Sequence, residues 1–210
     1  MQKIRNDIQI IDDVLSEKDI IEIHGSFVLN GFPWYMVSGS VVLKDNQYII
    51  STSPLTQNLD SNIFEAFQLC HDFIFEHTAC SDRCGVPDYI LKKLTDKIDL
   101  SEYNYVQRIK ANFQSKFLSD PDCYNTPHYD NLNEHLVIIY YVNDSDGDTF
   151  IFENDKYPLK IKKRVSPKAG RFVIFNGNHF HAGIHPKSND YRIVINFNLM
   201  KNNSSNMIRI

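Results

Sequence analysis

The second half of the chain is a series of short apolar segments separated by turn residues, and this pattern restricts the fold most strongly. The segments are rich in β-branched and aromatic residues, whereas "NDSDGD" and "PKAG" between them are typical of turns. We expect strands over residues 104–113, 136–142, 149–153, 158–165, 171–176 and 191–199. Short strands at regular spacing predict a sandwich, a barrel or a jelly roll.

The first half of the chain begins with a strand and a helix. Residues 8–14 predict a short strand. Ser16 and Asp19 then form an imperfect capping box, which starts a helix that ends between Gly25 and Gly31.

Two further helices and a hairpin are expected before the strand series. Apolar residues at helical spacing predict the best-defined helix over residues 60–79. Pro87 is placed to begin another helix over residues 87–98. Residues 41–51 predict a hairpin. The aromatic stretch 31–36 has two open interpretations, packing on the core or lining a substrate pocket.

Length and composition restrict the class of protein. With 210 residues and neither an internal repeat nor a low-complexity linker, the chain predicts one domain over 1–210, with mixed helical support over about 1–100 and a β core over about 101–200. The net charge of -4 and the lack of a basic stripe argue against a nucleic-acid partner. No apolar run approaches the ~20 residues of a membrane helix. A cytoplasmic protein without a disulfide framework is therefore expected.

A histidine and an aspartate stand two positions apart in "TPHYDN", just ahead of the apolar run "HLVIIYYV". On an extended segment, His128 and Asp130 point to the same side. A second group of histidines lies about 50 residues later in "NHFHAGIHP", which holds His179, His181 and His185. One histidine from this group would complete a 2-His-1-carboxylate triad, the ligand set of non-haem Fe(II) oxygenases.

Other histidines and cysteines have less specific surroundings. Each of His24, His71, His77 and His135 stands alone, so we expect surface or core roles for them. A zinc site at Cys70, Cys80 and Cys84 stays open, although residues 70, 77 and 84 have the spacing of core positions on a helix. The stretch "DSDGD" at 144–148 is expected to be a turn and not a calcium loop.

An arginine follows on the last expected strand, in "YRIVINFNL", eleven residues after His181. The guanidinium of Arg192 is always charged, so inside a β barrel it needs an anion as a partner. A dicarboxylate co-substrate such as 2-oxoglutarate would supply one, held by two parallel hydrogen bonds.

These features together resemble the Fe(II)/2-oxoglutarate-dependent dioxygenases, in particular the prolyl 4-hydroxylase-like branch. The resemblance covers just under half of the chain, from about 105 to 199. It is carried by "HYD" at 128–130, "YYVND" at 140–144, "DGDT" at 146–149, "AGRFVIFNGNHFHAG" at 169–183 and "YRIVINF" at 191–197. The resemblance implies an α+β fold with a double-stranded β-helix (jelly roll, cupin-like) core and supporting N-terminal helices.

The resemblance also implies roles for individual residues. His128, Asp130 and His181 would bind Fe(II), with His179 and His185 flanking the third ligand. Arg192 would bind the distal carboxylate of 2-oxoglutarate, together with the hydroxyl of Tyr141. The Ser or Thr that often follows the arginine is replaced by Val194 and Asn196. Asn196 can donate a hydrogen bond to the carboxylate and Val194 cannot.

The function implied is hydroxylation of a substrate C–H bond with Fe(II), 2-oxoglutarate and dioxygen, with ascorbate as a reductant. A prolyl residue in a peptide or protein is the substrate expected from the branch, followed by a free amino acid or another small metabolite. The alternative in another class is a non-enzymatic cupin-like module that binds a metal and a small acid.

Overall fold

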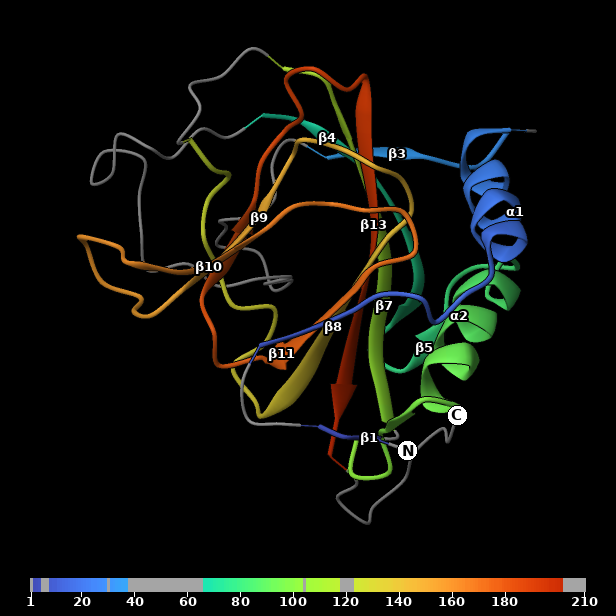
Figure 1. Cartoon of the computed structure of the whole chain (residues 1–210), viewed down its shortest axis with the longest axis horizontal. Helices are drawn as coiled ribbons and strands as arrows, with labels where there is room; N and C mark the ends of the chain where they lie inside the picture. Colours follow the sequence, from blue (N-terminus) through green and yellow to red (C-terminus); the bar gives the residue numbers. More distant parts are fainter. Residues whose placement is uncertain are drawn as a thin grey trace.

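The computed structural model describes residues 2–4, 8–29, 31–37, 66–103, 105–117 and 123–201. Strands dominate these ranges, with two helices in the first half (Figure 1). The helices are α1 (Glu17–Val28) and α2 (Gly85–Thr95). The strands are β1 (Gln2–Lys3), β2 (Gln9–Ile11), β3 (Tyr35–Val37), β4 (Gln68–Phe75), β5 (Thr78–Ala79), β6 (Ile98–Asp99), β7 (Tyr105–Ser115), β8 (His135–Tyr141), β9 (Thr149–Phe152), β10 (Ile161–Val165), β11 (Phe172–Asn176), β12 (His181–Gly183) and β13 (Tyr191–Met200).

The larger sheet of the core has the strand order β2-β11-β8-β13-β7-β4-β3, with β5 paired to β4. All of its neighbouring strands are antiparallel. The long strands β7 and β13 pair along almost their full length, from Tyr191 opposite Ser115 to Met200 opposite Tyr105. This pairing sets which side chains of the two strands lie beside each other in the site.

A smaller antiparallel sheet, in the order β10-β9-β12, lies opposite the large one. A bridge between His128 and His181 adds the segment around residue 128 to the β12 edge. Two opposed antiparallel sheets with strands that alternate between them form a double-stranded β-helix, as predicted. Figure 1 shows the smaller sheet on the left and both helices on the right, outside the large sheet.

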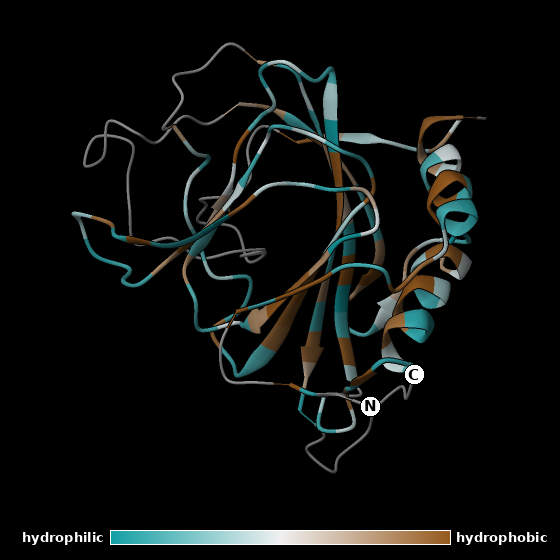
Figure 2. Ribbon diagram, in the orientation of Figure 1, coloured by the Kyte–Doolittle hydropathy of each residue, from teal (hydrophilic) through white to brown (hydrophobic). Residues whose placement is uncertain are grey.

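The central strands are buried on both faces, so they are almost continuously hydrophobic (Figure 2). In β8, alternate residues face opposite directions. Leu136, Ile138 and Tyr140 belong to the core beneath the helices. Val137, Ile139 and Tyr141 belong to a second core between the two sheets. Strand β8 therefore packs against the helix side with one face and against the small sheet with the other.

Helix α1 begins as predicted. The Ser16 hydroxyl accepts a hydrogen bond from the Asp19 amide, and the Asp19 carboxylate accepts one from the Ser16 amide, which completes the capping box. Ile23 and Phe27 bury one face of α1 against the core. Helix α2 occurs where a helix over 87–98 was predicted, but it starts two residues earlier at Gly85 and ends at Thr95, before β6. Neither helix of the described ranges has the length and apolar character to cross a membrane.

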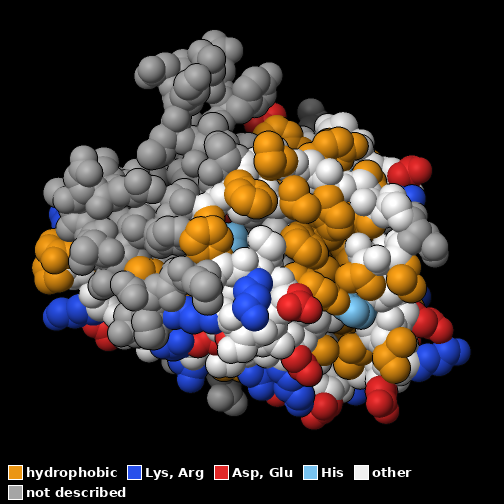
Figure 3. Space-filling view, turned by 90° about the horizontal axis from the view of Figure 1, so that it is seen from above, with side chains coloured by type: hydrophobic (Ala, Val, Ile, Leu, Met, Phe, Trp, Pro, Cys, Tyr) orange, Lys and Arg blue, Asp and Glu red, His pale blue; other side chains and the backbone are white. Residues whose placement is uncertain are grey.

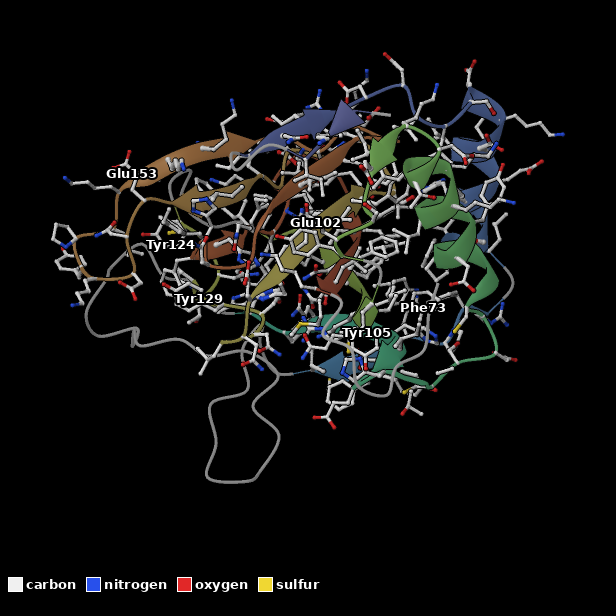
Figure 4. The ribbon with its side chains drawn as sticks, turned by 90° about the horizontal axis from the view of Figure 1, so that it is seen from below. Phe73, Glu102, Tyr105, Tyr124, Tyr129 and Glu153 are labelled. Atoms are coloured by element: carbon white, nitrogen blue, oxygen red, sulfur yellow. The ribbon has the colours of Figure 1, made fainter. Side chains whose placement is uncertain are left out.

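The helix predicted over residues 60–79 is wrong for its described part, which forms β4 and β5. A β-bulge in β4 explains the error. The register with β7 shifts between Asp72 and Ile74, so Phe73 is an extra residue in the ladder. The bulge places Cys70 and Phe73 in the interior with helical spacing. Figure 4 shows Phe73 on the side of the sheet where the helices pack.

The aromatic stretch 31–36 packs partly on the core. Trp34 contacts the rings of Phe27, Phe32 and Phe113, whereas Tyr35 and Met36 of β3 are exposed. Figure 3 shows hydrophobic side chains gathered over part of the face seen from above. The expected hairpin over 41–51 lies outside the described residues, whereas the six strands expected after residue 103 all occur.

A close backbone contact within the core generates the first prediction. A Cβ atom at Gly177 would lie 2.1 Å from the ring of His135, which is fully buried. We expect Gly177→Ala to reduce the free energy of unfolding by about 1–3 kcal/mol, because neither the ring nor the strand has space to move.

Urea denaturation of Gly177→Ala beside Gly85→Ala measures this effect. Gly85 starts α2 and has no atom within 4 Å of its added Cβ, so its variant should change stability by less than about 0.5 kcal/mol. Equal stability of the two variants would contradict the packing described at His135.

Candidate metal and anion site

A polar pocket lies between the two sheets, lined by strands of the large sheet (β4, β7, β8 and β13) and of the small sheet (β9 and β12). It brings together the residues singled out in the sequence, His128, Asp130, His181, Arg192 and Asn196. Its other lining residues are Gln68, Arg108, Lys110, Asn112, Gln114, Asn125, Ile139, Thr149, Ala182, Gly183 and Val194. Three strands of the large sheet (β4, β7 and β13) supply most of the polar side chains.

The two histidines of the triad are positioned by the backbone. The amide of His128 donates to the carbonyl of His181 at 2.9 Å, and the amide of His181 donates back at 3.1 Å. This bridge places their rings 4.9 Å apart, although 53 positions separate them in the sequence. The side-chain ligand atoms of His128, Asp130 and His181 all lie within 4.8 Å of one another, which makes them a metal-site candidate.

Hydrogen bonds select the tautomer of both rings. Nδ1–H of His128 donates to the carbonyl of Thr126 at 2.9 Å, and Nδ1–H of His181 donates to the carbonyl of His179 at 3.1 Å. With Nδ1 protonated, the neutral ring keeps its lone pair on Nε2. The Nε2 atoms lie 3.9 Å and 3.5 Å from the oxygens of Asp130. Both lone pairs are therefore available on the side where the carboxylate stands, as a metal ligand set requires.

Asp130 is buried among hydrogen-bond donors from two strands. Arg108 of β7 donates from Nη2 to Oδ1 at 2.8 Å. Asn196 and Asn198 of β13 each donate from Nδ2 to Oδ2 at 2.9 Å. A buried carboxylate is tolerated only with such compensation, so these three side chains keep Asp130 ionised and oriented.

The protonation states suit cation binding. Burial opposes ionisation of Asp130, but Arg108 and the neighbouring histidines outweigh it and hold the pKa of this carboxyl well below its usual value. Burial, with a smaller effect from His181, lowers the pKa of His128 to about 4. At neutral pH, the pair presents one carboxylate and one neutral imidazole, the forms that ligate a metal ion.

The flanking histidines have other surroundings. His179 contributes its main-chain carbonyl to His181, and its ring lies 6.4 Å from the ring of Phe175. His185 is buried and donates from Nδ1 to the carbonyl of Ser115. The structure thus groups His181, and not His179 or His185, with His128 and Asp130. Its role as a ligand stays a prediction.

Arg192 lies in the same pocket and is 4% exposed. Nη1 donates to Gln114 Oε1 at 2.6 Å, and Nη2 donates to the Thr149 hydroxyl at 2.8 Å. Both partners are neutral, and Nε has no hydrogen-bond partner in the part of the chain that the structure describes. Burial lowers the pKa of the guanidinium. A buried cation with only neutral hydrogen-bond partners is suited to bind an anion.

Tyr141 and Asn196, expected beside the co-substrate, have defined partners. The Tyr141 hydroxyl donates to Thr149 Oγ1 at 2.7 Å, and the Arg192 guanidinium lies 5.7 Å from the centre of its ring. Tyr141 therefore reaches the anion position through Thr149. Asn196 donates to Asp130, which gives its amide a different partner from the one expected.

Sequence reasoning missed several pocket residues, above all Arg108, Lys110, Gln114 and Thr149. A signal for most of them exists in "RIKANFQ", where polar residues alternate with Ile109, Ala111 and Phe113. Period-two alternation of this kind marks a strand with one polar face. In an ordinary sheet that face would be solvated, so only the opposing sheet reveals that it is buried.

Other candidate sites have structural explanations. No zinc cluster forms at Cys70, Cys80 and Cys84, as judged from the residues placed in the structure. The turn at 144–148 is held by Asp146, whose carboxylate accepts from the amides of Ser188 and Asn189. Tyr124 and Tyr129, labelled in Figure 4, pack in an aromatic cluster with Phe150 and Phe180 beside the smaller sheet.

The four histidines that stand alone in the sequence form hydrogen bonds with other residues of the protein. His24 contacts the Tyr191 hydroxyl, His71 contacts the Pro33 carbonyl and the Ser81 hydroxyl, and His77 donates to the Val106 carbonyl. His135 donates from Nδ1 to the Asn133 carbonyl. Their expected core and surface roles agree with these contacts.

Comparison with known proteins gives a family match and several similar folds. Residues 114–200 match the family model described as the 2OG-Fe(II) oxygenase superfamily. No curated protein sequence matches the chain. A solved structure of a 2OG-Fe(II) oxygenase family oxidoreductase from Burkholderia pseudomallei is similar with a TM-score of 0.60 and 10% identity, over 98% of each chain.

Two prolyl hydroxylases are also similar in fold. One is from Trichoplax adhaerens, solved with a hypoxia inducible factor peptide, with a TM-score of 0.54, 14% identity and coverage of 93% of this chain and 84% of that chain. The other is a Pseudomonas putida prolyl-4-hydroxylase, with a TM-score of 0.50, 11% identity and coverage of 93% and 92%. At these identities, the similarity concerns the fold.

The ring that completes the triad can be tested by metal binding. Removing a residue that hydrogen-bonds to a metal ligand typically reduces metal affinity ~10–100-fold. We expect His181→Ala to reduce Co(II) affinity by more than this, because it removes a ligand itself. His179→Ala is the matched control, because Ala keeps the main-chain carbonyl that orients His181. Titration of Co(II), followed by its visible absorption, measures both. Stronger loss in His179→Ala would move the third ligand to that residue.

The ion pair of Asp130 can be tested by its effect on stability. Arg108→Met should reduce the free energy of unfolding by about 3–5 kcal/mol, because it leaves the buried carboxylate uncompensated. Asp130→Asn in the same chain removes that charge, so the double variant should lose less than Arg108→Met alone.

The control is Lys18→Met, which breaks the exposed pair with Glu22 and should change stability by less than about 1 kcal/mol. If the loss caused by Arg108→Met is as large with Asn at position 130 as with Asp, it comes from packing and not from charge.

Proposed function

We propose that this chain is a 2OG-Fe(II) oxygenase, because residues 114–200 match that family model, and that the polar pocket is its active site, with His128, Asp130 and His181 as the iron ligands. The cofactors of the domain are Fe(II) and 2-oxoglutarate. The donor set of two imidazoles and one carboxylate fits Fe(II), because it leaves coordination positions open for a chelating acid and dioxygen. The family match supports an enzyme over the alternative of a cupin-like module without enzymatic activity.

Several residues of the chain prepare this ligand set. The backbone bridge between His128 and His181 sets the separation of the rings, and the carbonyls of Thr126 and His179 fix their rotation. Arg108 orients Asp130 by its ion pair. Outer partners of this kind hold metal ligands in place and tune their basicity. Bound together, Fe(II) and 2-oxoglutarate supply the oxidising chemistry, and the protein supplies orientation and charge pairing.

The observation that carries the proposal is the buried guanidinium of Arg192. It faces the same pocket as the triad and has only neutral hydrogen-bond partners, Gln114 and Thr149, in the described chain. We assign it to the distal carboxylate of 2-oxoglutarate, with Nε as its spare donor. Tyr141 supports this position through the Thr149 hydroxyl. Asn196 acts on the iron side, through Asp130.

The reaction proposed is hydroxylation of a substrate C–H bond. A prolyl residue in a peptide or protein is one candidate substrate, supported by the prolyl-4-hydroxylase resemblance of "HYD" and "YRIVINF". A free amino acid or another small metabolite is the other. The first experiment measures aerobic 2-oxoglutarate consumption with Fe(II) and ascorbate, alone and with proline-containing peptides, free proline and cell lysate. No consumption under any of these conditions would contradict the assignment.

Arg192 should set the affinity for 2-oxoglutarate and not for iron. Losing a bidentate contact to a buried carboxylate costs about 2–5 kcal/mol, which raises the apparent 2-oxoglutarate constant of Arg192→Ala by roughly 30-fold or more. Arg192→Lys should lose less, because the charge remains without the planar fork. Tyr141→Phe should lose about 1 kcal/mol, the value of one hydrogen bond.

Titration with Fe(II) and then with 2-oxoglutarate separates the two affinities. The iron affinity measured without co-substrate should be the same in the three variants and the wild type. Arg83 is an exposed arginine before α2, so Arg83→Ala is the control for removing a guanidinium outside the pocket. Unchanged 2-oxoglutarate binding in Arg192→Ala would mean that this arginine is structural.

A further inference from the structure

One buried basic residue of the pocket, Lys110, has no role in the ligand triad or beside Arg192 in the proposed function. On β7, the polar side chains at alternate positions all line the pocket, namely Arg108, Lys110, Asn112 and Gln114. The first of these pairs with Asp130, and the last accepts from Arg192. Lys110 lies between them along the strand, opposite Asn196 of β13 in the register. It therefore lies between the iron side and the Arg192 side of the pocket.

The ammonium of Lys110 has no fixed partner. Its side chain is buried, with 6% of the residue exposed, and no hydrogen bond or ion pair of Lys110 is found within the described ranges. Asp72 of β4 is its neighbour in the register, but no ion pair joins them. Burial lowers the pKa of Lys110 and the adjacent Arg108 lowers it further, while Cys70, Asp72 and Asp130 oppose this shift. A lysine in such a position is costly unless an anion enters the pocket.

The charge of the pocket leads to the same conclusion. Its lining carries three basic side chains, Arg108, Lys110 and Arg192, and one carboxylate, Asp130, which in their ionised forms leave two positive charges. If the proposed function holds, Fe(II) and the 2-oxoglutarate dianion add charges that cancel each other. The loaded pocket therefore keeps an excess of positive charge in a buried place, and a third ligand with negative charge would be attracted to it.

The lining also restricts the kind of ligand. Apart from Ile139, Ala182, Gly183 and Val194, every lining residue of the described chain has a polar or charged side chain, and none is aromatic except the two histidine ligands. Sites for apolar groups are lined by hydrophobic and aromatic side chains. The pocket thus suits a small polar molecule better than a bare prolyl ring.

We propose that Lys110 binds an anionic group of the primary substrate and that this substrate is a small acid held beside the iron ligands. The proposal rests on the proposed function and names the substrate class for that site. A lysine ammonium binds carboxylate and phosphate alike, as a point charge. The anion on Lys110 would direct a C–H bond of the acid toward the metal side, so Lys110 is a specificity-determining residue.

The experiment begins with the wild-type enzyme loaded with Fe(II) and 2-oxoglutarate. A cell extract freed of macromolecules is separated on an anion exchanger, and each fraction is tested for stimulation of 2-oxoglutarate consumption. We expect the stimulating material among the retained, anionic fractions. Treatment with alkaline phosphatase then separates the two sources of charge, because it abolishes stimulation by a phosphate ester and not by a carboxylic acid.

Variants of Lys110 test whether this residue binds the anionic group of the stimulating compound. In Lys110→Met, the amount of the stimulating fraction that gives half-maximal consumption should rise at least tenfold more than the half-saturating concentration of 2-oxoglutarate does. Lys110→Arg should recover part of the loss, because it restores the charge. Lys163→Met removes an exposed lysine from β10 and is the matched control. Binding of the same fraction to the anaerobic Co(II) and 2-oxoglutarate complex, followed by Co(II) absorption, should show the same order of variants.

Several results would overturn the proposal. Stimulation by unretained or macromolecular fractions alone, or by no fraction, would exclude a small acid. A rise in the 2-oxoglutarate constant of Lys110→Met without a change for the acid would assign Lys110 to the co-substrate. An equal loss in Asp72→Asn would make Lys110 a structural partner of β4. If the wild type consumes no 2-oxoglutarate either alone or with any fraction or candidate substrate, the proposed function fails, which is a distinct outcome.

Discussion

The buried carboxylate of Asp130 is the group on which the arrangement of the site depends. It accepts from Arg108 of β7 and from Asn196 and Asn198 of β13, and it lies beside the ring nitrogens of His128 and His181. An ionised group with 7% exposure is stable only when each of these donors is in place. The Asp130 carboxylate thereby connects β7 and β13 of the large sheet with the β12 edge of the small sheet.

The large sheet has to satisfy two requirements at once. Its outer face is apolar in β7, β8, β11 and β13, where it forms one core cluster with residues of α1 and α2. Its inner face is apolar in β8 and β11, where the small sheet closes over Val137 and Phe175, and polar in β7 and β13, where the pocket lies. A strand such as β7 therefore has one face that stabilises the fold and another that binds charge. The polar face is maintained at a cost in stability that each ion pair and hydrogen bond offsets only in part.

The prediction from sequence succeeded where local patterns and burial agree. The strands after residue 103 are short, β-branched and bounded by turn residues, so their pattern was sufficient. The capping box of Ser16 and Asp19 placed the start of α1 for a similar local reason. It failed at β4, because a bulge at Phe73 changed the spacing of buried residues from strand-like to helix-like. Pairing with β7 decided the conformation of that segment, and no local signal reports such pairing.

The sequence by itself determined the chemical groups of the site and their order along the chain. His128 and Asp130 share one side of an extended segment because of the period of the backbone, and the position of Arg192 on a late strand indicated an anion. Only the tertiary structure decided which of three nearby histidines joins them, because the bridge between residues 128 and 181 depends on closure of the small sheet. It also decided that Arg108 and Lys110 face inward, because the same alternation would suit a solvated strand until a second sheet covers it.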